Sequence, residues 1–189
     1  MMIRWISAAV FAVWAIGAGA APERYVLDAR GSTIGFAFSL EGAPVTGKVP
    51  VAAAHVVVDF DNLAASQVTA QFDITRSDAG NVFMTEAMLS ASVLNASAHP
   101  QAVFRSRRVV PVGAGARLEG DLTLRGVTRP VVLDGQIFRK RGSDPGDLDN
   151  LVLIFTGAVS RAEFGATGFQ RVVADRVELE IIAAIRRAE

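Results

Sequence analysis

The sequence predicts an all-β protein, in which an antiparallel sheet of about eight strands closes into a barrel and carries one short helical insertion. Apolar and polar residues alternate with a period of two along most of the chain, as they do in strands with one buried face. Turn-forming residues, for example at 113–115 and 142–146, separate the alternating segments. Because an open sheet of consecutive strands leaves two exposed edges, closure into a barrel is the expected arrangement.

The individual strands follow from the same alternation. In the first, Ile34, Phe36 and Phe38 place large side chains on one face, and the intervening Gly35 and Ala37 place small ones on the other. Alternating or β-branched patterns recur through the rest of the chain. The expected strands are residues 34–40, 56–60, 68–74, 102–110, 116–124, 131–138, 151–159 and 177–183.

One segment, residues 81–98, lacks the strand pattern. It contains neither Gly nor Pro and carries Val82, Met84 and Met88 at irregular helical spacing, which predicts one or two short helices. His99-Pro100 ends this segment and begins the next strand. The insertion is expected either to cover one mouth of the barrel or to pack against its outer wall.

The first residues have the pattern of a secretory signal peptide, which we assign to residues 1–20. Arg4 is the only charge before Glu23, an apolar run follows it, and the small residues Ala18-Gly19-Ala20 suit a cleavage site. The alternative is a membrane anchor, but the apolar run is marginal for a span of roughly 20 residues and lacks a basic flank. We expect export to the periplasm, with cleavage after Ala20 or Ala21.

The remaining residues, 21–189, are enough for one domain with its own core. The whole chain has 19 basic and 19 acidic residues and a formal net charge of 0, so no overall field would collect nucleic acid or anionic membrane. The chain has no cysteine, which excludes disulfides and a lipid-modified cysteine anchor. Monomer and homodimer both stay open.

Catalytic and metal-binding patterns are sparse. The two histidines, His55 and His99, would have to converge with carboxylates from distant strands to bind zinc. The chain has no Gly-x-Ser-x-Gly elbow and no glycine-rich phosphate loop between a strand and a helix. We therefore expect neither an enzyme nor a bound metal or cofactor.

The interior of the barrel allows two interpretations. A barrel of eight strands is either filled by its own side chains or just wide enough to hold one small ligand. The large inward aromatic residues suit both, because such side chains are usually buried in any core. Small inward neighbours such as Ala70, Gly120 and Gly157 favour a cavity.

A turn of unusual composition joins two of the strands, in the stretch GDLTLRGVTRPVVL. Gly126 can adopt a positive φ and Pro130 fixes its own φ, so residues 125–130 are expected to make a tight link. Arg125 and Arg129 would then bond carboxylates or loop carbonyls and stabilise the turn. The alternative is that they bind an anionic head group at the barrel mouth.

The same stretch, at residues 122–133, resembles the signature of the YceI-like family, lipocalin-like barrel proteins that bind polyisoprenoids. Segments 25–28, 32–36, 58–61, 99–106 and 160–165 fit that family in the same order. The resemblance departs at Gly31 and at Leu40-Glu41, where the family usually has His, and around residues 87–91, where it often has Arg. These departures concern recognition of a ligand's head group, whereas the apolar alternation persists.

The resemblance implies an exported protein that holds a polyisoprenoid or similar long apolar chain, such as a quinone tail, inside its barrel. The expected cavity lining comprises Ile34, Phe36, Phe38, Phe60, Phe72, Phe104, Leu122, Phe155 and Phe164. The expected structural motif comprises Arg125, Gly126, Thr128, Arg129, Pro130, Arg161 and Gly165. Two alternatives remain: a hydrolase or isomerase acting on such a lipid, and a filled barrel that serves as a stress-related interaction module.

Overall fold

A computed structural model describes residues 22–139, 142–144 and 146–188, so the predicted signal peptide lies outside the described residues. Within these ranges, ten strands form one antiparallel sheet. Their bounds are β1 Glu23–Leu27, β2 Thr33–Leu40, β3 Ala43–Val49, β4 Val51–Val58, β5 Gln67–Asp73, β6 Gln101–Val112, β7 Gly115–Leu124, β8 Val127–Arg139, β9 Asn150–Ser160 and β10 Arg176–Arg187.

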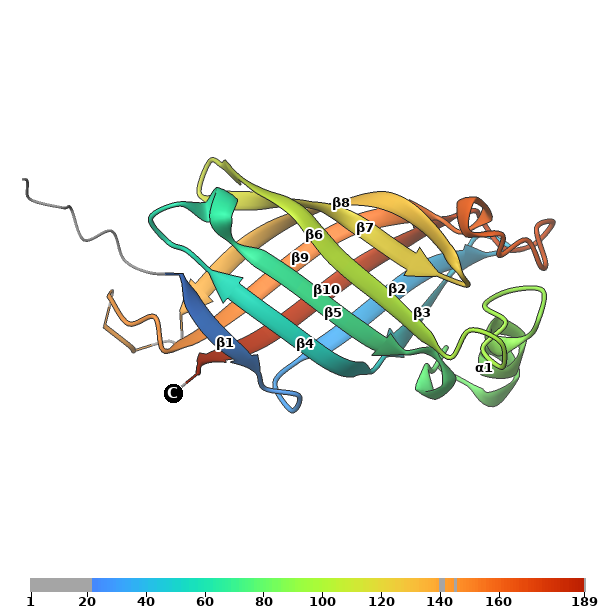
Figure 1. Cartoon of the computed structure of the whole chain (residues 1–189). Helices are drawn as coiled ribbons and strands as arrows, with labels where there is room; N and C mark the ends of the chain where they lie inside the picture. Colours follow the sequence, from blue (N-terminus) through green and yellow to red (C-terminus); the bar gives the residue numbers. More distant parts are fainter. Residues whose placement is uncertain (1–21, 140–141, 145, 189) are drawn as a thin grey trace, which may run out of the picture.

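The ten strands occupy eight positions in a closed barrel. β1 and β2 follow one another along β10, with Leu27 opposite Ile185 and Thr33 opposite Ile182. β3 and β4, separated only by Pro50, follow one another along β2 and β1 in the same way. Each remaining strand pairs with its neighbours in sequence, which closes the antiparallel barrel drawn in Figure 1. The predicted fold class is confirmed.

Two strands, β1 and β3, were not predicted from the sequence, and a third, β4, ends earlier than predicted. The sequence of β3, APVTGKV, interrupts its alternation with Pro44 and Gly47, and β1 has only five residues. β4 ends at Val58, so the predicted strand 56–60 is too long, and Phe60 follows the strand in a bend. Such boundaries depend on cross-strand pairing, which a single segment does not reveal.

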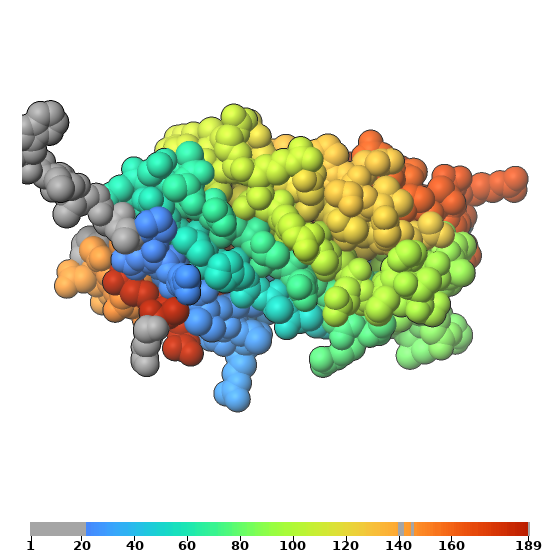
Figure 2. Space-filling model, in the orientation of Figure 1, coloured from blue at the N-terminus to red at the C-terminus, as the bar shows by residue number. Residues whose placement is uncertain are grey.

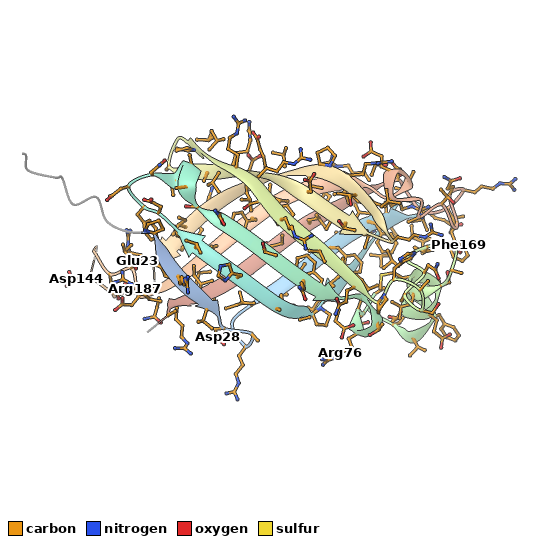
Figure 3. The ribbon with its side chains drawn as sticks, in the orientation of Figure 1. Glu23, Asp28, Arg76, Asp144, Phe169 and Arg187 are labelled. Carbon is orange, nitrogen blue, oxygen red and sulfur yellow. The ribbon has the colours of Figure 1, made fainter. Side chains whose placement is uncertain are left out.

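The barrel has two different ends. One end, here called the helical mouth, carries the turn Glu41-Gly42, the segment 74–100, the turn Arg125-Gly126 and the loop 161–175. The opposite end, here called the terminal end, carries the two ends of the described chain. Figure 3 shows Phe169 at the helical mouth, and Glu23 and Arg187 at the terminal end.

The inserted segment forms one α-helix, α1 Val82–Leu89, rather than two. The Asn81 side chain caps it by accepting a hydrogen bond from the Met84 N–H. Residues 90–98 form turns, in which Asn95 adopts a φ of +49°. Three short 3₁₀ helices complete the described structure, at Leu63–Ala65, Ile74–Arg76 and Ala162–Phe164. No helix in the described ranges is long and apolar enough to cross a membrane.

Two of the three buried apolar clusters among the described residues fill part of the barrel, and the third, Ile74, Ala96 and Ala102, lies at the helical mouth. The terminal cluster lies at the terminal end, and the wall cluster involves β6, β7, β8 and the 3₁₀ helix Ala162–Phe164. The terminal cluster comprises Tyr25, Val56, Val58, Leu151, Leu153 and Ile185. The wall cluster comprises Phe104, Val109, Leu118, Val131, Leu133 and Phe164. The terminal end is therefore packed, and the free volume lies between it and the helical mouth.

Candidate functional site

An apolar cavity in two adjoining parts occupies the barrel. The wider part, about 380 Å³, lies at the helical mouth, and the narrower part, about 170 Å³, lies deeper among the strands. A volume of this order falls within the range of small-molecule sites, roughly 300 to 1,000 Å³. The two parts share the lining residues Ile34, Val49, Ile74, Leu122, Leu124 and Leu179, so they lie directly beside one another in the barrel.

Seven of the nine residues expected to line a cavity do line it. Phe36 and Phe38 contact the wider part, Ile34 and Leu122 contact both parts, and the deeper residues contact the narrower part. Those deeper residues are Phe72, Phe104 and Phe155. Ligand binding by these side chains stays a prediction.

The structure corrects the prediction for the other two residues, Phe60 and Phe164, which do not line either part of the cavity. The ring of Phe60 packs edge-on against Tyr25 at the terminal end, with ring centroids 6.3 Å apart. Phe164 is 1% exposed and belongs to the wall cluster. Both lie outside strands, where the alternation of inward and outward residues no longer indicates direction.

The lining also includes residues that the sequence analysis did not select. Met84, Ala87 and Met88 of α1 line the wider part, so the insertion covers the mouth rather than the outer wall. Val172 and Val173 reach the same part from the loop 161–175. The two segments meet where the Gly168 N–H donates to the Ser92 carbonyl at 2.8 Å, and they lie side by side in Figure 2. The sequence predicted that the methionines lie in a helix, but it did not predict that they face the cavity.

The cavity persists among so many aromatic residues because several rings pack closely against glycines on neighbouring strands. Phe36 is directly opposite Gly47, and Phe155 is directly opposite Gly135. A β-carbon built at Gly135 would lie 2.6 Å from the Phe155 ring. The rings therefore occupy space along the wall that side chains would otherwise fill. This arrangement leaves the centre of the barrel open.

Only two polar side chains, Ser32 and Arg161, are among the described residues that line the cavity. The Ser32 hydroxyl donates to the Asp28 carbonyl at 2.7 Å and accepts from the Ala184 N–H at 3.1 Å. In the ranges that the structure describes, no group of three His, Asp or Glu residues is placed to hold a metal ion.

Arg161 is 8% exposed and holds the loop 161–175 together. Its guanidinium donates to the carbonyls of Ala166 at 2.7 Å, Ala174 at 3.2 Å and Val173 at 3.3 Å. Burial lowers the pKa of Arg161 below its usual value, and the negative charge of Asp175 opposes that shift. The observed contacts of the guanidinium are with backbone carbonyls of its own loop, which is compatible with the predicted structural role.

The turn Arg125-Gly126 is tighter than predicted. Leu124 pairs with Val127, so only two residues form the turn, and both have positive φ, +52° and +74°. This is the geometry of the two-residue hairpin turns that match strand twist. The predicted turn of residues 125–130 was too long, because Pro130 pairs with Asp121 inside β8. A proline is tolerated there only where the ladder does not need its N–H.

Three sequence segments that carry the family resemblance meet around this turn. The Arg125 guanidinium donates to the Ala91 carbonyl at 2.8 Å, and a β-carbon at Gly165 would lie 3.0 Å from it. A β-carbon at Gly126 would lie 2.8 Å from the His99 ring. Arg125 thus bonds a loop carbonyl, and the contacts tie the turn, the insertion and the loop 161–175 together.

The remaining motif residues lie on β8. Thr128 is hydrogen-bonded through its hydroxyl to the Thr123 hydroxyl across the hairpin, at 2.8 Å. Arg129 is exposed and donates to the carbonyl of Thr128 at 3.2 Å. Neither side chain lines the cavity.

Replacing Gly126 by Val is expected to lower the free energy of unfolding by about 1–3 kcal/mol, because a β-branched residue resists positive φ. The His99 ring adds a steric conflict. Gly113→Val is a matched control, since Gly113 has a φ of +55° but no neighbour within 4 Å of its β-carbon position. Urea unfolding followed by circular dichroism measures both, and Gly126→Val should cost more. An equal loss would show that the His99 contact is unimportant.

The sequence pattern of the YceI-like domain matches residues 25–184. The chain belongs to the YceI-like family. Among its relatives, the UPF0312 protein of Vibrio parahaemolyticus is 29% identical over 154 residues, which cover 79% of this chain and 81% of that protein.

Solved structures that share the fold of this YceI-like chain include the following two. BcnA of Burkholderia cenocepacia has a TM-score of 0.73 at 18% identity, and the match covers 84% of this chain and 98% of BcnA. A polyisoprenoid binding domain from Saccharophagus degradans, implicated in plant cell wall breakdown, has a TM-score of 0.63 at 14% identity. The match covers 87% of this chain and 98% of that domain. At these identities the likeness establishes the barrel architecture alone.

One of the three departures from the YceI-like pattern, Gly31, has a steric counterpart. A β-carbon at Gly31 would lie 2.8 Å from the β-carbon of Ala184, so the backbone here leaves little room for a larger residue. A second departure, at Glu41, lies in the exposed turn between β2 and β3, where Glu41 has a φ of +50°.

Proposed function

We propose that this protein is an exported binding protein that holds a polyisoprenoid, or a similar long apolar chain such as a quinone tail, for carriage or storage in the periplasm. The observation that carries the proposal is the apolar cavity, in two adjoining parts, between the helical mouth and the terminal cluster. The Saccharophagus degradans domain of the same fold is described as polyisoprenoid-binding, which supports the same ligand class.

The lining favours binding over catalysis. A hydrolase or isomerase requires a group at the cavity that transfers a proton or attacks the substrate, usually a histidine or a carboxylate. The described lining residues include neither type, and Ser32 and Arg161 are engaged with backbone groups. The cavity also argues against a barrel filled by its own side chains.

Apolar burial should dominate the affinity. Each buried CH₂ contributes about 0.8 kcal/mol, offset by the cost of ordering the chain. Affinity should therefore rise with the number of isoprene units until the cavity is full. Salt should have little effect, because ionic screening does not weaken apolar burial.

The proposal is tested by titrating lipid-free protein with farnesol, geranylgeraniol and solanesol, at low and high salt. We expect the affinity to increase with tail length to a plateau and to be independent of salt. An affinity that ignores tail length and collapses with salt would instead assign binding to surface charges such as Arg129. Mass spectrometry of protein from a periplasmic fraction supplies a second arm: we expect a chain that begins near Ala21, with a co-purified lipid and no product of its turnover.

A further inference from the structure

The helical mouth carries large apolar side chains that face solvent. On α1, Val82 is 68% exposed and Phe83 is 85% exposed. On the loop 161–175, Phe169 is 53% exposed and Val172 is 36% exposed. The two segments lie at the same end of the barrel in Figure 1, and Figure 3 labels Phe169 there. Exposed apolar side chains gathered in one region are typical of an interaction surface.

The helix α1 is apolar on both of its faces. Met84, Ala87 and Met88 line the cavity, whereas Val82 and Phe83 face solvent. A helix on the surface of a soluble protein usually has one polar face, and a helix that is apolar all round is typical of a protein core or a membrane. The outward face of α1 therefore has the composition of a contact surface.

The exposed side chains border the opening of the cavity. Phe169 and Val172 are exposed and also line the wider part, so the cavity reaches solvent beside them. Phe83 directly precedes the lining residue Met84. An apolar chain that enters or leaves here passes these side chains. The surface that supplies the chain must therefore contact them.

The size and charge of this region favour a lipid surface over a protein partner. The four side chains expose roughly 400 Å², from the usual size of such residues, whereas each partner in a stable protein interface contributes roughly 800 Å². The charged residues that follow them in sequence on each segment include Glu86 and Arg171, which have opposite signs and offer no net attraction to a charged partner. Aromatic side chains are favoured at the boundary between membrane and water.

We propose that the helical mouth docks onto a lipid bilayer, that Phe83 and Phe169 insert into its surface, and that the apolar chain passes between bilayer and cavity at this contact. The inference rests on the proposed function for the identity of the chain, since polyisoprenoids and quinone tails are membrane components. Docking and holding are separable, because Phe83 does not line the cavity.

Tryptophan fluorescence tests the docking. Trp5 and Trp14 lie in the predicted signal peptide, and residues 21–189 contain no tryptophan. In protein from a periplasmic fraction, with its N-terminus verified near Ala21, the emission of Phe83→Trp should shift to the blue when phosphatidylcholine vesicles are added. Brominated phospholipid should quench it. Phe138→Trp is the matched control and should not respond, because Phe138 is 43% exposed near the terminal end of β8.

Vesicle sedimentation measures the affinity for the bilayer. Phe83→Ala should bind phosphatidylcholine vesicles about tenfold more weakly than the wild type, because the buried area of the ring is lost. Phe138→Ala should bind like the wild type. Anionic phosphatidylglycerol in the vesicles and added salt should have little effect. The rate at which a fluorescent prenol moves from vesicles to the protein should fall with the affinity for vesicles.

A Phe83→Trp emission that ignores vesicles, or equal vesicle binding by Phe83→Ala and the wild type, would overturn the inference. Binding that requires phosphatidylglycerol and collapses with salt would also overturn it, by assigning the contact to charges such as Arg76 and Arg171. Titration with farnesol in the absence of vesicles separates it from the proposed function. Farnesol binding without docking contradicts the docking alone, and docking without farnesol binding contradicts the isoprenoid alone. Circular dichroism verifies that the Phe83 variants are folded, as expected for an exposed position.

Discussion

Replacing Phe164 by alanine is expected to lower the free energy of unfolding by about 3–5 kcal/mol, through lost apolar burial and the void that remains. The ring is 1% exposed and packs with the buried residues of the wall cluster. Small domains have a free energy of unfolding of only about 5–15 kcal/mol, so this single substitution would remove a large part of the stability.

Phe83→Ala is the matched control for Phe164→Ala. Phe83 is 85% exposed on the outer side of α1, so truncating it removes almost no buried surface. Urea unfolding of both variants, followed by circular dichroism, gives the comparison. A cost below about 1 kcal/mol for Phe164→Ala would show that the neighbouring side chains collapse into the space and that the cluster is loosely packed.

Replacing Leu122 by aspartate is expected to abolish chain binding, with a loss of about 100-fold or more, because a bound apolar chain would strip water from the carboxylate without offering it a partner. Leu122 lines both parts of the cavity, so the introduced charge would lie where they join. Titration with geranylgeraniol measures the loss. Val132→Asp, on the outer wall at 49% exposure, should bind like the wild type.

The pH dependence distinguishes lost binding from lost folding in Leu122→Asp. Apolar surroundings raise the pKa of a carboxyl group, because they disfavour its charged form. Binding should therefore recover as the pH falls through that raised pKa and the group becomes neutral. Weak binding that does not respond to pH, in a protein with an intact circular dichroism spectrum, would mean that Leu122 supports the cavity by shape rather than by its lack of charge.

The alternation of residues predicted most of the barrel and most of the lining. Ile34, Phe36 and Phe38 lie on one face of β2 as expected, and all three line the cavity. Strands with a broken pattern were missed: β3 contains Pro44 and Gly47, so its place beside β2 follows from pairing rather than from its own residues. Phe60 and Phe164 were misplaced because period-two reasoning stops where a strand stops.

In the turn Arg125-Gly126 as well, the sequence predicted the local conformation and only the tertiary structure decided the contacts. A glycine with positive φ was predictable from the neighbouring residues, and it is observed at +74°. The partners of the turn were not predictable, because His99, Ala91 and Gly165 lie tens of residues away in the sequence. These contacts explain why a two-residue turn is accompanied by an arginine: its guanidinium reaches the inserted segment and leaves the cavity free.

The sequence by itself determined the class of fold, the inward face of each regular strand and the apolar character of the interior. These are local properties, since alternation along one strand decides which side chains face the core. Only the tertiary structure decided that the interior is a cavity rather than a filled core. That outcome depends on the cross-strand register, which places Phe36 opposite Gly47 and Phe155 opposite Gly135 and so lets the rings lie along the wall. A register shifted by one residue would turn these side chains to the other face, and the same composition would enclose no such space.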